Sequence, residues 1–305
     1  MGLFHCPIGA AYYDDEGCID CGMCYAKTSE ERVEASKKIR AYFQAHAARN
    51  ATPKKIALCG KGGVGKSTIT ALLARALKEA GNRVLILDTD ESNPGLYRLF
   101  GFEREPRPLI TLRKQNPGEA EIEGGWLDRE RISLDDIPAA YKAGENGFQF
   151  LMTGKIEDPF QGCACSMANV VKEFMEKLTV GDGEIVVIDM EAGVESFGRG
   201  VERFVDTILA VVEPSYESMA LAGKIAYMAE GMGIGRIRAV LNKVPTENVR
   251  LRMEEELGKK GLKIAGTVFF DPLLNEAGFE GRPIATGGDT RADMKTIVKA
   301  LFASD

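Results

Sequence analysis

The stretch KIALCGKGGVGKSTITALLARALKEAG, residues 55–81, decides the fold of this chain. It opens with an apolar run of strand length, passes through a glycine-rich loop and ends in a segment of helical composition. The loop from Gly60 to Ser67 matches the pattern G-x-x-x-x-G-K-[ST]. When such a loop joins a strand to a helix, its backbone N–H groups point at phosphate oxygens and the helix N-terminus adds positive potential. The stretch therefore predicts a phosphate-binding loop between a strand and a helix.

The rest of residues 54–305 continues the alternation of apolar strands and helices. Further runs of strand length are RVLILDTD, EIVVIDM, DTILAVVEP, IRAVLNKV and KIAGTVFF. Strands that are apolar along their whole length and alternate with helices are typical of a mostly parallel sheet covered on both faces. We therefore predict a doubly wound α/β domain. Residues 101–147, rich in Arg, Glu, Pro and Gly, carry no readable pattern and no assigned role.

Two shorter segments precede this domain. Residues 29–53 are charged at first and place apolar side chains at roughly helical intervals, which predicts a connecting helix, opened by Thr28 or Ser29, and a linker. Residues 1–28 are rich in turns and in cysteine. We expect a small cysteine module, a connecting helix with its linker, and the α/β domain over 54–305.

Composition narrows the class of protein. The net charge of −6 argues against nucleic acid as a partner. No stretch approaches the roughly 20 apolar residues that span a bilayer, and the N-terminus MGLFHCPIGA lacks the features of a signal peptide. We therefore expect a cytoplasmic protein without a membrane partner. In a reducing cytosol the seven cysteines are better suited to metal binding than to disulfides.

The loop should bind the phosphates of a nucleotide. Lys66 would neutralise the β and γ phosphates, and the Ser67 hydroxyl would ligate Mg²⁺. The alternative is a glycine-rich turn that binds no nucleotide. The residues of the loop predicted to bind nucleotide are Gly60, Lys61, Gly62, Gly63, Val64, Gly65, Lys66, Ser67 and Thr68.

An additional lysine early in the loop, Lys61, followed by Gly62 and Gly63, resembles the deviant Walker A loop of the MinD/ParA/nitrogenase iron protein class. In that class the early lysine reaches across a dimer interface to the partner's nucleotide. The resemblance therefore implies an ATP-dependent homodimer and an ATPase, in which Lys61, Lys66 and Asp90 serve catalysis.

Three carboxylates at predicted strand ends match further elements of the same class. Asp88 and Asp90 in LILDTD resemble the pair that orients Mg²⁺ and the attacking water, and Asp189 in IVVIDM resembles the residue at the Mg²⁺ shell. The implied magnesium residues are Ser67, Asp88 and Asp189. A strand-terminal aspartate can also simply cap a helix, and this alternative stays open for each of them.

Two weaker resemblances concern the base of the nucleotide. Asn242 in VLNKV resembles the asparagine of the class that reads adenine at a strand end. Asp271 and Pro272, after TVFF, resemble the loop that covers the base. Asn and Asp-Pro are also ordinary loop residues.

The N-terminal cysteines have the spacing of a cluster-binding loop. Cys18, Cys21 and Cys24 follow the pattern C-x2-C-x2-C, which wraps a loop around one face of a cubane. The fourth ligand would be Cys6, which is followed by Pro7. The segment thus resembles part of a two-cluster ferredoxin and predicts one [4Fe–4S] cluster. A tetrahedral zinc site, or no metal at all, are the alternatives.

A second cysteine pair, Cys163-Ala-Cys165, lies in a polar loop that runs into the predicted helix VVKEFMEKL. Two thiols cannot complete a four-coordinate site within one chain. A two-fold dimer would bring four thiolates together and so suit Ni²⁺, Zn²⁺ or a bridging [4Fe–4S] cluster. The alternative is a pair of buried structural cysteines.

Taken together, Lys61 to Ser67, the pair Cys163 and Cys165, and the segment DMEAGV that begins at Asp189 resemble the CooC-type nickel-insertion accessory ATPases of carbon monoxide dehydrogenase. The resemblance covers residues 54–305. It implies an ATP-dependent homodimer that binds metal through the paired cysteines and has carbon monoxide dehydrogenase, or another Fe–S or Ni–Fe–S enzyme, as its client. In this family segment Glu191 is either a coupling residue or an ordinary surface glutamate.

Other functions remain open on the same residues. A cluster beside an ATP-gated dimer is also the arrangement of a nitrogenase-type reductase that passes electrons to a client. An Mrp-type cluster carrier is disfavoured because those proteins use C-x-x-C. A MinD-like membrane regulator needs a basic C-terminal helix, whereas ADMKTIVKALFASD carries two lysines and is better suited to packing against the core.

Overall fold

The computed structural model describes residues 18–45, 52–92, 95–114, 125–155, 164–194, 197, 201–285 and 287–303. Its strands are β1 (Lys55–Cys59), β2 (Arg83–Asp88), β3 (Ala143–Glu145), β4 (Phe148–Met152), β5 (Glu184–Asp189), β6 (Thr207–Val212), β7 (Arg236–Val244) and β8 (Lys263–Phe269). Its α-helices are α1 (Ser29–Ala45), α2 (Lys66–Glu79), α3 (Leu96–Leu99), α4 (Thr111–Lys114), α6 (Ala164–Lys177), α8 (Tyr216–Gly231), α9 (Glu247–Gly258), α10 (Pro272–Glu280) and α11 (Gly288–Phe302). Short 3-10 helices are η1 (Trp126–Asp128), η2 (Leu134–Asp136), η3 (Ala139–Tyr141) and η4 (Glu202–Phe204).

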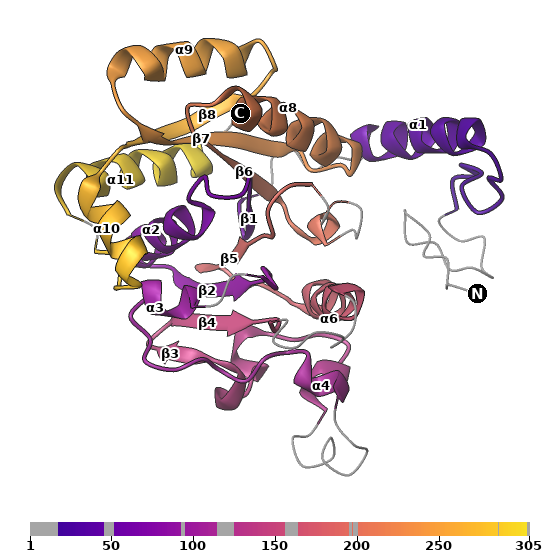
Figure 1. The fold of residues 1–305 in the computed structure, drawn as a ribbon. Helices are drawn as coiled ribbons and strands as arrows, with labels where there is room; N and C mark the ends of the chain where they lie inside the picture. Colours follow the sequence, from indigo (N-terminus) through magenta and orange to yellow (C-terminus); the bar gives the residue numbers. More distant parts are fainter. Residues whose placement is uncertain are drawn as a thin grey trace.

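The eight strands form one sheet in the order β3-β4-β2-β5-β1-β6-β7-β8 (Figure 1). Each neighbouring pair is parallel except β3 with β4. The register sets Asp189 of β5 opposite Asp88 of β2 on one side and opposite Leu58 of β1 on the other. Because parallel strands end at the same edge, β1 delivers the glycine-rich loop to the edge where both carboxylates stand.

Alternate side chains of the central strands point to opposite faces of the sheet. In β1, Ala57 and Cys59 pack into one apolar cluster, whereas Ile56 and Leu58 pack into another. The first cluster includes residues of α6 and α8, and the second includes residues of α2 and α11. Helices on both faces of a mostly parallel sheet confirm the predicted doubly wound α/β fold.

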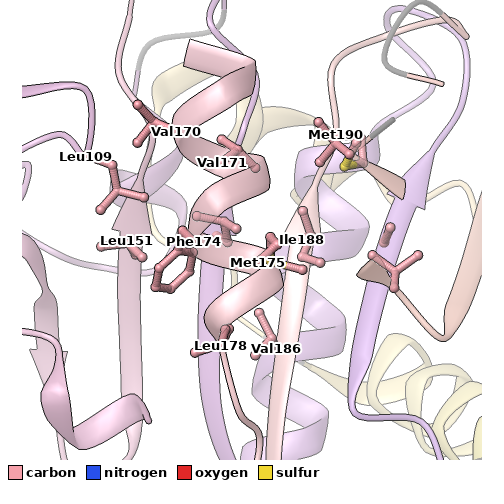
Figure 2. Packing of buried hydrophobic residues seen from close by; sticks show 14 of the residues in the cluster. Leu109, Leu151, Val170, Val171, Phe174, Met175, Leu178, Val186, Ile188 and Met190 are labelled. Atoms are coloured by element: carbon pink, nitrogen blue, oxygen red, sulfur yellow. The ribbon is translucent and has the colours of Figure 1, made fainter. Parts of the chain in front are cut away.

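Helix α6 is anchored to the sheet by its apolar side (Figure 2). Phe174 and Met175 are fully buried in the cluster that also holds Val186 and Ile188 of β5. Burying each such side chain stabilises the fold by about 1.5–3 kcal/mol. The helix that contains one cysteine of the C-x-C pair is therefore fixed on the strand that ends in Asp189.

The edge strand β3 and its neighbour β4 were not predicted from the sequence. They form an antiparallel hairpin whose turn is Asn146-Gly147, with both residues at positive φ (53° and 72°). This is the Asn-Gly signal of a two-residue hairpin. The described residues before it also contribute to the core, because Trp126, Leu134 and Tyr141 are buried in the same cluster as α6. Part of residues 101–147 thus builds the core, although no role was predicted for this segment.

Helix α1 lies beside α8 at one end of the molecule (Figure 1). The Thr28 hydroxyl accepts a hydrogen bond from the Glu31 N–H at 3.2 Å, and the Glu31 carboxylate accepts one from the Thr28 N–H at 3.0 Å. This reciprocal pair is a capping box at the start of the helix. Arg40 fastens the helix: its guanidinium stacks over the Tyr227 ring at 3.7 Å and pairs with Glu230 at 3.2 Å. The division of the chain into separate domains here stays a prediction.

The C-terminal helix α11 packs against the core, as expected. Met294, Ile297 and Leu301 are fully buried in the cluster that also holds side chains of α2. Arg236 of β7 donates to the carbonyl oxygens of Leu301 and Ala303, both at 2.9 Å. The apolar face of this helix is thus used inside the protein.

Candidate nucleotide-binding site

The glycine-rich loop has the backbone that its sequence predicts. It leaves β1 at Cys59 and enters α2 at Lys66, with Gly65 in the left-handed region at φ 91°. A Cβ atom on Gly65 would lie 2.4 Å from Asn242 Nδ2, and one on Gly60 would lie 2.6 Å from the Val211 carbonyl oxygen. Both positions therefore require glycine on steric grounds.

Lys66 and Ser67 open α2 and face the ends of the strands. The Lys66 side chain is nearly buried, and its Nζ donates to the Lys61 carbonyl oxygen at 3.3 Å. The Ser67 hydroxyl donates to Asp189 Oδ2 at 2.8 Å, and the Thr70 hydroxyl donates to Asp189 Oδ1 at 3.2 Å. The structure thus joins the predicted phosphate lysine, magnesium serine and magnesium aspartate in one cluster.

Asp88 and Asp189 are buried carboxyl groups on neighbouring strands. Burial raises the pKa of Asp88 to about 7, opposed by the Lys155 ammonium. Burial also raises the pKa of Asp189 to about 6, opposed by the hydrogen bond from Ser67. Buried carboxylates whose charged form is disfavoured are stabilised by a cation. With the Ser67 hydroxyl they form a set of hard oxygen donors that fits Mg²⁺.

Asp90 stands two residues beyond the end of β2. Its backbone N–H donates to Asp88 Oδ1 at 3.0 Å, and its own carboxylate accepts from the Ser92 N–H at 3.0 Å and the Ser92 hydroxyl at 2.6 Å. These are local turn contacts, as expected of an aspartate that terminates a strand. A role for Asp90 in orienting water stays a prediction.

Lys61, within the loop, belongs to a small charged network with Glu213 and Lys243. Its Nζ is 3.6 Å from Glu213 Oε1, and Lys243 Nζ is 3.6 Å from Glu213 Oε2. Lys243, in the left-handed region at φ 56°, also donates to the Gly63 carbonyl oxygen at 2.5 Å. Glu213 thus pairs with Lys61, the additional lysine of the deviant Walker A pattern, within its own chain.

A cavity of about 350 Å³ adjoins the loop and is lined by its residues Gly63 and Gly65. The buried Asn242 lines it and donates from Nδ2 to the Val64 carbonyl oxygen at 2.8 Å. Asp271 also lines it, capping α10 through a hydrogen bond from the Leu273 N–H at 2.8 Å, while Pro272 is the first residue of that helix. Of the residues predicted for the base, Asn242 and Asp271 thus line this cavity together with Phe270 and Phe279, whereas Pro272 does not line it.

The N-terminal cysteine loop is described only from Cys18 onward. Cys18 and Cys24 are exposed and Cys21 is buried. Asp20, at φ 48°, donates its N–H to Cys18 Sγ at 3.4 Å, and Gly22 is at φ 85°. Thiols on a tightly curved loop with an N–H···S contact fit iron–sulfur ligation chemically.

Neither predicted metal site lies wholly within the described residues. Among the described residues no three His, Cys, Asp or Glu side chains form a group that could hold a metal ion. Cys6 and Cys163 lie outside the described residues, and so does the side chain of Cys165. Cys59 is a buried thiol in the core, as expected. Across the described helices, none combines the length and apolarity needed to span a membrane.

Sequence reasoning missed three residues of this site. Lys155 is 2.7 Å from Asp88 Oδ2, Thr70 bonds Asp189, and Glu213 pairs with two lysines. Lys155 follows β4, the strand that was missed, so nothing marked it as the end of a strand. Glu213 could have been found, because it ends the predicted strand DTILAVVEP next to the loop.

Comparison with known proteins agrees with this geometry. Residues 56–284 match the family model of the CobQ/CobB/MinD/ParA nucleotide binding domain. The chain is 40% identical over 211 residues to an uncharacterized ATP-binding protein of Methanocaldococcus jannaschii, covering 66% of this chain and 82% of that one. It is 36% identical over 198 residues to the carbon monoxide dehydrogenase accessory protein CooC of Rhodospirillum rubrum, covering 62% of this chain and 74% of that one.

Among solved structures, the septum site-determining protein MinD of Pyrococcus horikoshii, complexed with Mg-ADP, has the same fold. It superposes with a TM-score of 0.59 at 17% identity, covering 81% of this chain and 95% of that one. The loop, the strand-end carboxylates and the matched family model agree on one assignment. This chain belongs to the CobQ/CobB/MinD/ParA family of nucleotide-binding proteins.

Proposed function

We propose that this protein is a homodimeric ATPase that supports the maturation of a metallocluster, by helping to load nickel or an Fe–S cluster into carbon monoxide dehydrogenase or a related metalloenzyme. The observation that carries the proposal is the 36% identity over 198 residues to the CooC accessory protein. The pair Cys163 and Cys165 supplies thiol ligands suited to such a cargo.

The geometry of the strand ends supports ATP hydrolysis. Lys66 opens α2 beside the loop, where its charge would stabilise the β and γ phosphates of ATP. Ser67, Asp88 and Asp189 would hold Mg²⁺, which neutralises charge that develops on the transferred phosphoryl group. Lys61, held by Glu213 in this chain, is the residue proposed to reach the nucleotide of a second copy.

The position of α6 supports a link between nucleotide and cargo. Helix α6 begins at Ala164, inside the C-x-C pair, and its apolar face is buried against β5. Strand β5 ends at Asp189, which bonds Ser67. A rearrangement at the magnesium carboxylates would therefore change the position of α6, the helix that begins between the two cysteines.

An anaerobic metal analysis tests this function. We would compare the wild type with Cys163→Ser/Cys165→Ser, with Cys18→Ser/Cys21→Ser, and with Cys59→Ala as a control thiol from the core. Nickel, zinc and iron are quantified in the purified proteins with and without ATP and Mg²⁺, and ATP hydrolysis is measured in parallel. The expected result is ATP-dependent nickel binding that is lost in the first double variant and kept in the other two.

Two results would contradict the proposal. One is a Cys163→Ser/Cys165→Ser variant that binds nickel as well as the wild type does. The other is a protein that binds ADP but shows no ATP hydrolysis with or without nickel.

A second function, an ATP-gated reductase, is favoured by the N-terminal loop. The curved backbone at Asp20 and Gly22 and the N–H···S contact at Cys18 suit a cluster that is retained for electron transfer. In that case the N-terminal cluster would pass an electron to a client Fe–S enzyme under ATP control. ATP-dependent oxidation of this cluster by a client, followed by EPR and abolished in Cys18→Ser/Cys21→Ser, in a protein that binds no nickel, would select this function over the first.

A further inference from the structure

Lys155 ties the end of β4 to the carboxylate end of β2. Its Nζ is 2.7 Å from Asp88 Oδ2 and also donates to the Asp90 carbonyl oxygen. Its side chain is 9% exposed and that of Asp88 is 1% exposed, so the pair is removed from solvent. Thr153 completes the connection, because its N–H and its hydroxyl both donate to the Asp88 carbonyl oxygen, at 3.0 and 3.1 Å.

The four carboxylate oxygens of the proposed magnesium aspartates all have protein donors. Asp88 Oδ1 accepts from the Asp90 N–H and Oδ2 from Lys155. Asp189 Oδ1 accepts from the Thr70 hydroxyl and Oδ2 from the Ser67 hydroxyl. Of these four donors Lys155 alone carries a charge. A divalent cation bound between the carboxylates would therefore repel the Lys155 ammonium more strongly than it would repel the three neutral donors.

We propose that Lys155 is an internal counter-ion that holds Asp88 in the nucleotide-free protein and gives up this carboxylate when Mg²⁺ arrives with the nucleotide. A buried carboxylate without a cation costs several kcal/mol, which is why the empty site needs such a group. The same ammonium lowers the affinity of the site for Mg²⁺ alone. Magnesium then binds together with the phosphates, whose negative charge compensates for the presence of Lys155.

Lys155 acts as a positioning residue, because it touches Asp88 and the backbone of Asp90. It is the third residue after the end of β4, on the connection that leads towards α6. The inference rests on the proposed nucleotide function of the same site, and it assigns the regulation of magnesium binding there.

A magnesium titration without nucleotide tests the inference. The melting temperatures of the wild type, Lys155→Met and Lys155→Arg are measured first in EDTA and then at increasing concentrations of Mg²⁺. In EDTA, Lys155→Met should melt about 5 °C or more below the wild type, because Asp88 is left buried without its cation. Added Mg²⁺ should restore its stability, with a midpoint about tenfold or more below that of the wild type, since no internal cation competes. Lys155→Arg keeps the charge and should behave like the wild type.

Lys177→Met serves as the matched control. Lys177 also pairs with a carboxylate, Glu173, at 2.8 Å, and donates to the Leu127 carbonyl oxygen, away from the loop. Its loss should lower the melting temperature without changing the Mg²⁺ midpoint. A Lys155→Met midpoint equal to or above that of the wild type would overturn the inference, since a merely structural lysine predicts that result.

A double variant covers the case in which Lys155→Met does not fold in EDTA. Lys155→Met/Asp88→Asn removes both charges and should fold without Mg²⁺ while losing the response to it. If neither variant folds with or without Mg²⁺, Lys155 supports the fold by other means and the inference is wrong. Because these measurements need no ATP hydrolysis and no nickel, a failure of the proposed function leaves them interpretable.

Discussion

The glycine loop has two positions that look alike in sequence and differ in space. Gly65 lies at φ 91°, and a Cβ atom there would meet Asn242 Nδ2 at 2.4 Å. For Gly62 the nearest atom to an added Cβ is Ala192 Cβ at 3.8 Å, an ordinary contact. The motif pattern requires glycine at position 65 and allows any residue at position 62, and the neighbours that the fold brings to each position give the steric reason.

We expect Gly65→Ala to abolish ADP binding and Gly62→Ala to preserve the fold. A non-glycine residue held in the left-handed region costs about 1–3 kcal/mol, and the contact with Asn242 adds to this. Thermal melting and calorimetric titration with Mg²⁺ and ADP would measure both effects. Equal melting temperatures and equal ADP affinities in the two variants would contradict the geometry of the loop.

Asp206 controls the start of the central strand. Its Oδ2 accepts hydrogen bonds from the N–H groups of Lys54 at 2.9 Å and Lys55 at 2.8 Å, immediately before and at the beginning of β1. Asp206→Ala should lower the free energy of unfolding by about 1–3 kcal/mol, because two partly buried donors lose their acceptor. Asp206→Asn keeps an oxygen acceptor and should lose less. Urea unfolding at pH 7 measures the difference, and an alanine variant as stable as the wild type would count against this contact.

The Asp206 carboxyl group also makes the free energy of unfolding depend on pH, and the direction of that dependence follows from its pKa. Burial raises the pKa of Asp206 above its usual value, partly opposed by the two backbone hydrogen bonds. Folded protein therefore holds this proton to a higher pH than the unfolded chain does, and its contribution to stability falls as the pH rises through the raised pKa. Asp206→Asn should lack this part of the pH dependence when unfolding is repeated between pH 4 and pH 7.

At the scale of elements, the sequence predicted the buried parallel strands and missed the edge hairpin. Five of the six predicted strands are mostly buried because both of their faces are covered, whereas β8, at the edge of the sheet, is only partly buried. Apolar runs of this kind are visible in a single sequence. The hairpin of β3 and β4 is short, and only the Asn146-Gly147 turn marks it. Lys155 was missed together with β4, since its contact with Asp88 depends on a pairing of strands far apart in the chain. The roles predicted for the site residues rest on residue types, which are visible in the sequence. The distances between their side chains do not follow from the sequence.

The attachment of α1 to α8 depends strongly on one side chain. Arg40 stacks on Tyr227, donates to its carbonyl oxygen at 2.7 Å and pairs with Glu230. Arg40→Ala should therefore loosen α1 while leaving the sheet unchanged, which hydrogen exchange of the α1 amides would report as faster exchange. Lys37→Ala is the control, because Lys37 is exposed and pairs only locally with Glu34. Equal exchange in the two variants would show that Arg40 does not hold the helix.

At the scale of the whole molecule, we expect the nucleotide domain to be independent of the N-terminal segment. The family model begins at residue 56, and the strands of the sheet all lie beyond residue 54. A variant that starts at Thr52 should keep its ADP affinity and melt within about 5 °C of the full chain, while losing the iron assigned to the N-terminal cysteines. Loss of ADP binding on truncation would mean that the predicted division of the chain is wrong.

Helix α1 is long enough for a small tilt to move the cysteine loop at its N-terminal end by several ångströms. The contact at Arg40 lies eleven residues from the first residue of the helix, Ser29, and the cysteine loop continues beyond that end. At 1.5 Å per residue this arm is about 16 Å long, so a tilt of about 10° at the Arg40 contact swings the cysteine end through about 3 Å. If α1 turns with α8 at this contact, a slight rotation of α8 would therefore displace the cysteine loop by about 3 Å, the length of a hydrogen bond.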